Sequence, residues 1–427
     1  MQAYQTALIL GYGRSGRAAE ALLQSEGCVT TVASDDRMDD AAFFRHLEKS
    51  DFEVCIVSPG FALEHPWMIA VRHAGIPLLS ELELGWSRYR GRTIAVTGSN
   101  GKSTAVKWIC ESLVASGLKA EIGGNYGIPA SEVVAEHPDL DWLVLEVSSF
   151  QLETVQEFDA DIAVVLNVLP NHLNRHGTME RYLETKARIF GTSRAGGICV
   201  VPEQLKKCFM NAVPVERNWV TFGEGGLFRF CAGRIFKGQK SVLDLRETLF
   251  DTPVIGGCTG AAVTAVFEAG GLDAGALERT AKIFKPLRHR LQRLGEVNGV
   301  VYVNDSKATN LAAMAAAVGA IGRDIHLIAG GLPKETDYTF VKEILAERVR
   351  TIYVIGQASR AMFEAWNTVC PCVECGTLEG AFRSAAQAAA AGDTVLLSPG
   401  CASFDQFDGF EERGECFEKL FNGVKHA

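Results

Sequence analysis

Three regions of the sequence combine β-like segments with glycine-rich turns and helix-like segments. Two of them run in the order strand, turn, helix: Ala7–Leu10, Gly11–Gly16 and Arg17–Gln24, then Thr93–Thr97, Gly98–Lys102 and Ser103–Ser116. The third has β-like runs at Val300–Val303, Ile325–Ala329, Thr351–Ile355 and Thr394–Leu397. Strands that alternate with helices form parallel sheets with helices on their faces. The sequence therefore predicts an α/β fold, with a small antiparallel subregion between Gln204 and Pro253, where short β-like runs alternate with glycine.

A chain of 427 residues is too long for one hydrophobic core. At roughly 100–200 residues per domain, it predicts about two to four domains. We place boundaries near Gly91 and near Pro286, which gives domains over residues 1–91, 92–286 and 287–427. The alanine-rich stretches Ala312–Ala317 and Ala385–Ala391 have the composition of packed helices.

The formal net charge of −9, without a run of Lys or Arg, argues against nucleic acid or an anionic membrane as a partner. Apolar stretches such as Ala160–Leu169 are much shorter than the roughly 18 residues of a membrane-spanning helix. The first residues lack the basic region and cleavage site of a signal peptide. We therefore expect a cytoplasmic protein, and we take it to be a monomer.

The 12 cysteines are mostly single and lie within apolar segments, which is typical of small buried side chains in a reducing compartment. Cys370, Cys372 and Cys375 are close enough in sequence to bind zinc. No second ligand pair follows at the usual spacing, so we favour a structural role for these thiols.

The segment Thr97–Thr104 (TGSNGKST) follows a buried-strand pattern and opens a helix. Glycines let backbone N–H groups surround phosphate oxygens, and the helix N-terminus adds partial positive charge. A lysine at the position of Lys102 reaches the β- and γ-phosphates, and a hydroxyl at the position of Ser103 is a Mg²⁺ ligand. The usual spacing would place a glycine at Val96, so the segment predicts a shortened phosphate-binding loop.

Two further segments could supply the metal ligands that a phosphate loop needs. Glu146 ends the apolar run Asp141–Val147, where a carboxylate is costly unless it is paired or binds metal. The alternative is a carboxylate that caps the strand at the surface. His172 and His176 follow another apolar run, but single histidines are more often structural than ligands. Spacing alone decides neither case.

The first glycine loop, Gly11-x-Gly13-x-x-Gly16 with Asp35 nineteen residues beyond, fits a dinucleotide-binding motif. Read alone, it would indicate an NAD-dependent oxidoreductase. A UDP site would also bind a diphosphate at a helix N-terminus. The loop itself therefore does not distinguish an NAD site from a UDP site.

Several motifs together resemble the Mur ligase and folylpolyglutamate synthetase family. In the central region they are GSNGKST, LEVSSFQLE (Leu145–Glu153), and NHLNRH followed by ETKARIF (Glu184–Phe190). In the C-terminal region, NDSKATN (Asn304–Asn310) and SPGCASFDQFDGFEERG (Ser398–Gly414) resemble the members that add D-glutamate. The resemblance extends from Gly11 to Gly414 and argues against a sister ligase for another amino acid.

This resemblance implies a three-domain architecture. It has an N-terminal UDP-binding Rossmann-like domain, a central ATPase domain and a C-terminal Rossmann-like domain that binds the amino acid. The implied activity is ATP-dependent ligation of D-glutamate to UDP-N-acetylmuramoyl-L-alanine through an acyl phosphate, in peptidoglycan precursor synthesis. The implied cofactors are ATP and Mg²⁺ at two sites.

The resemblance also implies roles for individual residues around ATP and the metals. The ATP contacts would be Gly98, Asn100, Gly101, Lys102, Ser103 and Thr104, with Arg290 near the γ-phosphate and Asp305 at the ribose. The metal ligands would be Ser103, Glu146, His172 and a carbamylated Lys186. In the carbamate, CO₂ converts an ammonium that repels Mg²⁺ into an oxygen ligand. The alternative is an ordinary exposed helix lysine. The implied catalytic residues are Lys102, His172, Lys186 and Arg290.

The implied substrate contacts fall into three groups. At the UDP end they are Ser15, Arg17, Asp35 and Arg37. At the muramoyl-alanine end they are Asn125, Ser148 and Gln151. At D-glutamate they are Lys307, Thr309, Lys334, Ser403, Phe404 and Phe410, with Lys334 opposite the side-chain carboxylate.

One segment departs from the family pattern. The family has an HN-x-x-N motif at the start of the last central-domain helix, with an asparagine near the adenine, but Gly256–Ala262 (GGCTGAA) contains neither His nor Asn. The adenine contact is therefore unassigned, and we expect looser base selectivity. This departure is also the one observation that favours a non-catalytic nucleotide-binding regulator. The oxidoreductase alternative leaves GSNGKST, Glu146 and Lys186 unexplained.

Overall fold

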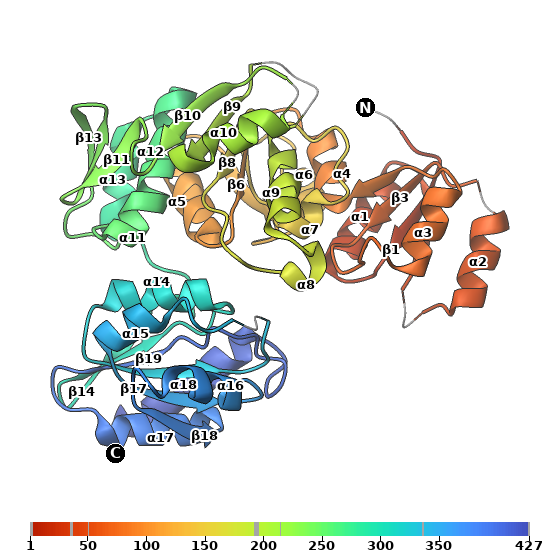
Figure 1. Cartoon of the computed structure of the whole chain (residues 1–427). Helices are drawn as coiled ribbons and strands as arrows, with labels where there is room; N and C mark the ends of the chain where they lie inside the picture. Colours follow the sequence, from red (N-terminus) through yellow and green to blue (C-terminus); the bar gives the residue numbers. More distant parts are fainter. Residues whose placement is uncertain are drawn as a thin grey trace. The chain divides into compact units, whose positions relative to one another are not determined.

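The computed structural model describes residues 3–34, 37–49, 51–191, 196–213, 215–334 and 337–425. By its internal contacts the chain divides into two compact units. The first comprises Met1–Val168 and Arg175–Phe284, and the second comprises Leu169–Asn174 and Lys285–Ala427. Within the described residues, the first unit contains two β-sheets and the second contains one (Figure 1).

The N-terminal sheet has four parallel strands in the order β2-β1-β3-β4. In this order their bounds are Val29–Ala33, Thr6–Leu10, Val54–Val57 and Leu78–Ser80. The helices of this part are α1 (Arg14–Ser25), α2 (Asp40–Lys49), α3 (Pro66–His73) and α4 (Glu81–Arg88). Helix α1 begins at Arg14 rather than at the expected Arg17, because Gly13 is extended and already caps the helix.

The central sheet has nine strands in the order β13-β12-β11-β10-β9-β8-β5-β7-β6. The bounds are β5 Arg92–Thr97, β6 Ala120–Gly124, β7 Trp142–Glu146, β8 Ile162–Val165, β9 Ile198–Pro202, β10 Asn218–Phe222, β11 Phe228–Cys231, β12 Arg234–Lys237 and β13 Lys240–Asp244. Strands β5 to β10 pair in parallel, whereas β12 pairs antiparallel with β11 and β13. The predicted antiparallel subregion is confirmed.

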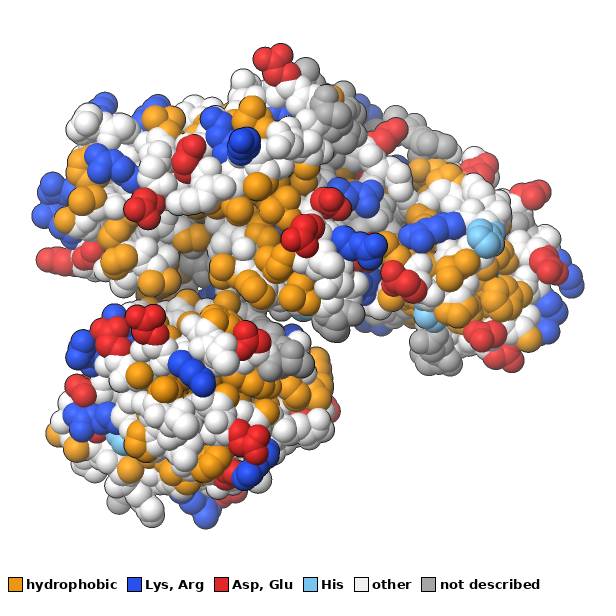
Figure 2. All heavy atoms as spheres, viewed as in Figure 1, with side chains coloured by type: hydrophobic (Ala, Val, Ile, Leu, Met, Phe, Trp, Pro, Cys, Tyr) orange, Lys and Arg blue, Asp and Glu red, His pale blue; other side chains and the backbone are white. Residues whose placement is uncertain are grey.

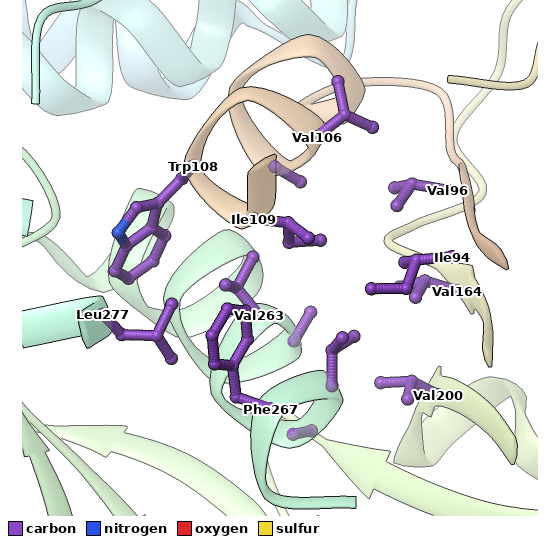
Figure 3. Packing of buried hydrophobic residues seen from close by; sticks show 14 of the residues in the cluster. Ile94, Val96, Val106, Trp108, Ile109, Val164, Val200, Val263, Phe267 and Leu277 are labelled. Atoms are coloured by element: carbon purple, nitrogen blue, oxygen red, sulfur yellow. The ribbon is translucent and has the colours of Figure 1, made fainter. Parts of the chain in front are cut away.

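Helices cover both faces of the central sheet because successive side chains of its strands are apolar and point to opposite faces. Ile94 and Val96 of β5 belong to one buried cluster and Ala95 to another. Figure 3 shows part of the first cluster, with Ile94 and Val96 of β5 and, from the covering helices, Trp108 and Phe267. Those helices are α5 (Lys102–Ala115), α12 (Ala261–Gly270) and α13 (Ala274–Ile283). This packing fixes the N-terminus of α5 at the carboxyl edge of the sheet.

The remaining helices of the central region are short. They are α6 (Ala130–Glu136), α7 (Ser149–Leu152), α8 (Leu173–His176), α9 (Met179–Ala187), α10 (Glu203–Ala212) and α11 (Pro253–Ile255), with a 3₁₀ turn at Arg188–Phe190 and a π-helical turn at Gly256–Gly260.

The second unit is a six-stranded sheet in the order β14-β15-β19-β16-β17-β18. The bounds are β14 Gln292–Val297, β15 Val300–Asn304, β16 Ile325–Gly330, β17 Val349–Ile355, β18 Cys372–Gly376 and β19 Thr394–Leu397. All neighbours pair in parallel except β14 and β15. The helices are α14 (Leu311–Ile321), α15 (Lys342–Arg348), α16 (Ser359–Trp366), α17 (Leu378–Ala388) and α18 (Phe410–Lys425). Two separate apolar clusters show that this sheet too is covered on both faces.

On the surface seen in Figure 2, basic and acidic side chains are interspersed rather than gathered into one basic patch. Within the described residues, no helix has the length and apolarity needed to cross a membrane.

Candidate functional site

The predicted phosphate loop joins the carboxyl end of β5 to the N-terminus of α5. Gly101 caps this helix with a φ of +85°, a conformation that favours glycine, and a Cβ there would come within 3.2 Å of the Thr259 hydroxyl. Lys102 Nζ donates hydrogen bonds to the carbonyl oxygens of Gly98 at 2.9 Å and Ser99 at 3.3 Å. Ser103 and Thr104 are buried in the first turn of the helix. The loop therefore has the shape of an anion-binding turn with its lysine folded over it.

Asn167, which the sequence motifs did not single out, braces this loop. Its side-chain oxygen accepts the Asn100 amide at 2.9 Å, and its Nδ2 donates to the Asn100 carbonyl at 3.1 Å. Because Asn167 follows β8, it ties the loop to the strand next to β5. A lone asparagine after a strand gives no sequence signal for this role.

Glu146 is only 2% exposed, so the interpretation as a surface cap is wrong. It ends β7, where it lies beside Val96 of β5. One carboxylate oxygen accepts a 2.6 Å hydrogen bond from Asn125 Nδ2, while Oε2 is buried without a hydrogen-bond partner. Gly124 allows this approach, because a Cβ there would lie 2.4 Å from the Glu146 carbonyl oxygen. A buried, unpaired carboxylate oxygen at the edge that carries the phosphate loop fits a Mg²⁺ ligand.

Lys186 is 1% exposed, so the interpretation as a solvated helix lysine is also wrong. It lies on α9, with Nζ 3.3 Å from the Thr97 hydroxyl and 4.6 Å from the centre of the Tyr182 ring. Burial lowers its pKa well below the ordinary value, and the charge of Lys102 lowers it further. The structure therefore brings Lys186 close to the phosphate loop as a buried amine whose charged form is disfavoured.

Ser148 and Gln151 form a capping box at the start of α7. Each satisfies the backbone amide of the other, with Ser148 N to Gln151 Oε1 at 3.0 Å and Gln151 N to Ser148 Oγ at 3.2 Å. They lie just beyond β7, where their side chains have this local structural role, and their contact with substrate stays a prediction.

At the first glycine loop, Arg17 and Arg37 converge on Tyr12. Arg17 donates to the Tyr12 carbonyl at 3.0 Å, and the Arg37 guanidinium lies 3.8 Å from the centre of the Tyr12 ring. Ser15 is in the first turn of α1. Asp35 lies outside the described residues. Two cations beside a helix N-terminus fit a diphosphate.

In the second unit, Arg290 lies in a strained turn, since its neighbours His289 and Leu291 have φ values of 60° and 45°. Arg290 Nε is buried without a hydrogen-bond partner. Asp305 follows β15 and accepts hydrogen bonds from the Ser398 hydroxyl at 2.8 Å and the Leu291 amide at 3.0 Å. Burial raises the pKa of Asp305 to about 6, although Ser398 and Arg290 act against this rise.

The loops NDSKATN and SPGCAS are held together by Arg413, which is 1% exposed and for which the sequence predicted no role. Its guanidinium donates to the Ser306 hydroxyl and carbonyl and to the carbonyls of Cys401 and Ala402. Around them Ser403 is buried, Lys307, Thr309, Lys334 and Phe410 are half-buried, and Phe404 is exposed. Lys307 Nζ lies 5.0 Å from the centre of the Phe410 ring.

The run that lacks the HN-x-x-N motif forms the π-helical turn Gly256–Gly260. The Cys258 thiol donates to the Leu166 carbonyl at 3.4 Å and lies 3.5 Å from Asn167 Nδ2. This run therefore packs against Asn167, which holds the phosphate loop in place. Looser selectivity for the nucleotide base stays a prediction.

The described residues contain no group of three His, Cys, Asp or Glu side chains placed to bind a metal. Cys370 and Cys375 instead point their thiols at the carbonyl oxygens of Val349 and Val373. His172 belongs to the segment Leu169–Asn174, which clusters with the second unit, so only Ser103, Glu146 and Lys186 of the predicted metal ligands lie in the first.

A cavity of about 1000 Å³ opens elsewhere in the first unit. Its lining includes Tyr4, Leu78, Arg92 and Trp142, which lie at or before the amino ends of strands in both sheets. The phosphate loop follows the opposite end of β5, so this cavity is not part of the candidate site.

Comparisons with known proteins identify the family. Residues 96–257 match the Mur ligase middle domain, and residues 289–401 match the Mur ligase, glutamate ligase domain. The chain is 34% identical over 445 residues to a UDP-N-acetylmuramoylalanine–D-glutamate ligase of Koribacter versatilis, covering 97% of this chain and 96% of that protein. A protein of the same name from Nitratidesulfovibrio vulgaris is 35% identical, covering 96% and 94%.

Solved structures show the same fold. The MurF ligase of Thermotoga maritima in complex with ADP superimposes with a TM-score of 0.61 at 20% identity, covering 99% of this chain and 95% of that one. The MurC ligase of the same organism gives a TM-score of 0.60 at 13% identity, covering 98% and 99%. The predicted α/β fold and the family resemblance are therefore confirmed. The chain belongs to the Mur ligase family, among the UDP-N-acetylmuramoylalanine–D-glutamate ligases.

Proposed function

We propose that this protein joins the amine of D-glutamate to the L-alanine carboxylate of UDP-N-acetylmuramoyl-L-alanine, with cleavage of ATP to ADP and phosphate. The observation that carries the proposal is the pair of buried titratable side chains beside the phosphate loop. Glu146 has a carboxylate oxygen without a hydrogen-bond partner, and Lys186 is almost completely buried. We place the reaction in the cytoplasm and take the enzyme to be a monomer.

The proposal divides the chain into three functional domains. Residues 1–91 bind the UDP end, where Ser15, Arg17 and Arg37 lie at the first glycine loop. Residues 92–286 bind ATP and the muramoyl-alanine end. Residues 287–427 bind D-glutamate, and Arg290 and Asp305 contact the nucleotide from there.

The chemistry is activation of a carboxylate. An oxygen of the L-alanine carboxylate attacks the γ-phosphorus of ATP, the bond to ADP breaks, and an acyl phosphate forms. The amine of D-glutamate then attacks the acyl carbon. The tetrahedral adduct loses inorganic phosphate and the nitrogen loses a proton, which leaves the amide. Lys102 and Arg290 neutralise charge on the phosphoryl oxygens, and the loops hold the reacting groups in line.

Magnesium would be held by Ser103 and Glu146 at one site, and by His172 and a carbamylated Lys186 at the other. When bound, Mg²⁺ neutralises the phosphate charge. The unpaired Glu146 oxygen and the buried Ser103 hydroxyl are oxygen donors of the kind that this ion prefers.

The environment of Lys186 suits carbamate formation. Only a neutral amine attacks CO₂, and burial lowers the pKa of this amine. Attack forms the N–C bond, releases one proton and converts the side chain into an anion. The new oxygens then replace an ammonium that would repel Mg²⁺.

D-Glutamate is a dianion that needs donors at both ends. Lys334 would pair with the side-chain carboxylate, and Lys307 and Thr309 would contribute from NDSKATN. Ser403, Phe404 and Phe410 surround the other carboxylate, partly through backbone N–H groups. At the muramoyl-alanine end, Asn125 is the contact that depends on Glu146 for its orientation.

Phosphate release should require UDP-N-acetylmuramoyl-L-alanine, D-glutamate and ATP together, because the first forms the acyl phosphate and the second discharges it. The measurement is continuous phosphate detection with each component omitted in turn, then with L-lysine or meso-diaminopimelate in place of D-glutamate. Equal turnover with these amino acids would contradict the roles of Lys334 and Thr309.

A further inference from the structure

Arg175 makes hydrogen bonds to two distant segments of the first unit. Its Nη1 donates to the Pro59 carbonyl at 3.0 Å, and its Nη2 donates to the Phe61 carbonyl at 2.6 Å. The same guanidinium donates hydrogen bonds to the Glu153 carboxylate, with Nε at 3.1 Å from both oxygens and Nη2 at 2.5 Å from Oε2. Both side chains are nearly buried, at 14% and 7% exposure. Arg175 thus ties the segment after β3 to the end of α7.

The segment held by Arg175 lies against the first glycine loop. Ser58 donates its hydroxyl hydrogen to the Gly11 carbonyl at 3.1 Å. A Cβ on Gly11 would come within 2.8 Å of the Ser58 side chain and 3.1 Å of the Phe61 ring. A shift of this segment would therefore move the loop where Arg17 and Arg37 converge.

A second set of contacts runs from Glu153 to the phosphate loop. His176 Nδ1 lies 3.6 Å from Glu153 Oε1, and its Nε2 is 3.0 Å from the Ser149 hydroxyl. The His176 ring packs on Tyr182 at 5.0 Å between centres. The Tyr182 hydroxyl is 3.2 Å from Ser99 Oγ, within the phosphate loop.

We propose that Arg175 is a positioning residue that couples occupancy of the first glycine loop to the geometry of the phosphate loop. Its guanidinium connects two carbonyls on one side to a carboxylate on the other. Lysine cannot replace it, because a single ammonium lacks the planar fork that reaches all three groups. The inference rests on the proposed function only in taking the first glycine loop as the UDP site.

Arg188 provides a matched control. Its guanidinium also donates to backbone carbonyls, those of Glu153 at 2.8 Å and of Val155, but both acceptors lie in the central region. Arg188→Lys therefore removes the same kind of contact beside Glu153 without releasing the segment around Ser58.

The first test is hydrogen exchange on the full-length, ligand-free chain, which requires no assumption about substrates. Arg175→Lys should speed exchange about tenfold or more in peptides covering residues 58–61 and also 98–103, whereas Arg188→Lys should leave both near parent rates. Glu153→Gln, which keeps the shape and removes the charge, should act like Arg175→Lys. Faster exchange confined to residues 58–61, or in neither segment, would overturn the coupling.

The second test measures ADP affinity by calorimetry with and without UDP-N-acetylmuramoyl-L-alanine. In the parent protein this ligand should tighten ADP binding by about 5–150-fold. In Arg175→Lys the ratio of the ADP affinities with and without the UDP ligand should fall toward one, while the affinity for ADP alone changes little. A merely structural role would not produce this combination. An unchanged ratio would contradict the inference. A parent protein that does not bind the UDP ligand would instead contradict the proposed function, and the exchange result would still decide the coupling.

Discussion

Replacing Lys186 with alanine is expected to lower turnover by about 10–100-fold or more, and added acetate or formate should restore part of it. The loss follows because the variant cannot form the carbamate that supports a metal. The gain follows because a small carboxylate can occupy the vacated position of the carbamate oxygens. Lys186 is buried beside Thr97 and Tyr182, so removal of its side chain also leaves space there. The measurement is the rate of phosphate release with and without each carboxylate.

Lys207→Ala is the control, since Lys207 is an exposed lysine on α10 of the same region. It should keep normal turnover and show no response to acetate. Full activity of Lys186→Ala would refute the carbamate while leaving Lys102 in its role. Loss of activity without rescue, together with normal ADP binding, would count against the carbamate as well.

Glu146→Gln is expected to lower turnover by about 10–100-fold or more at ordinary Mg²⁺ and to raise the Mg²⁺ concentration needed for half-maximal rate. Glutamine keeps the shape and the acceptor for Asn125, but it removes the negative charge and the unpaired oxygen. Thermal stability should not fall, because a buried charge without a countercharge is itself costly.

Glu136→Gln is the control, because Glu136 is exposed on α6. It should leave both the turnover rate and its dependence on Mg²⁺ unaltered. Unchanged Mg²⁺ dependence in Glu146→Gln would mean that this carboxylate is not a metal ligand.

Much of the architecture was predictable because it depends on local pattern. Ile94 and Val96 are apolar at strand spacing, and the turn at Gly98–Gly101 needs glycine, so β5 and α5 follow from the sequence itself. The phosphate-loop residues could likewise be placed at the end of a strand, because an apolar run precedes them and a helix-like run follows. The burial of Glu146 and Lys186 could be seen only in the fold, because it depends on packing against distant segments.

Other contacts had no local signal. Asn167, Arg175 and Arg413 act through backbone groups far away in the chain, such as the pairing of Asn167 with Asn100. Two of these residues, Arg175 and Arg413, lie in quoted motifs, but the sequence does not show which backbone groups they contact. The apolar run Ala160–Leu169 forms a strand only over Ile162–Val165, because Leu166 and Asn167 make backbone hydrogen bonds to the phosphate loop.

In the proposed reaction the L-alanine carboxylate is phosphorylated before the amide forms. The most direct measurement uses UDP-N-acetylmuramoyl-L-alanine with both carboxylate oxygens labelled by ¹⁸O, together with D-glutamate and ATP. The carboxylate oxygen that attacks the γ-phosphorus leaves with phosphate, so mass spectrometry should find one ¹⁸O in each phosphate released. Phosphate without ¹⁸O, or label in AMP, would contradict the acyl phosphate and with it this account of the enzyme.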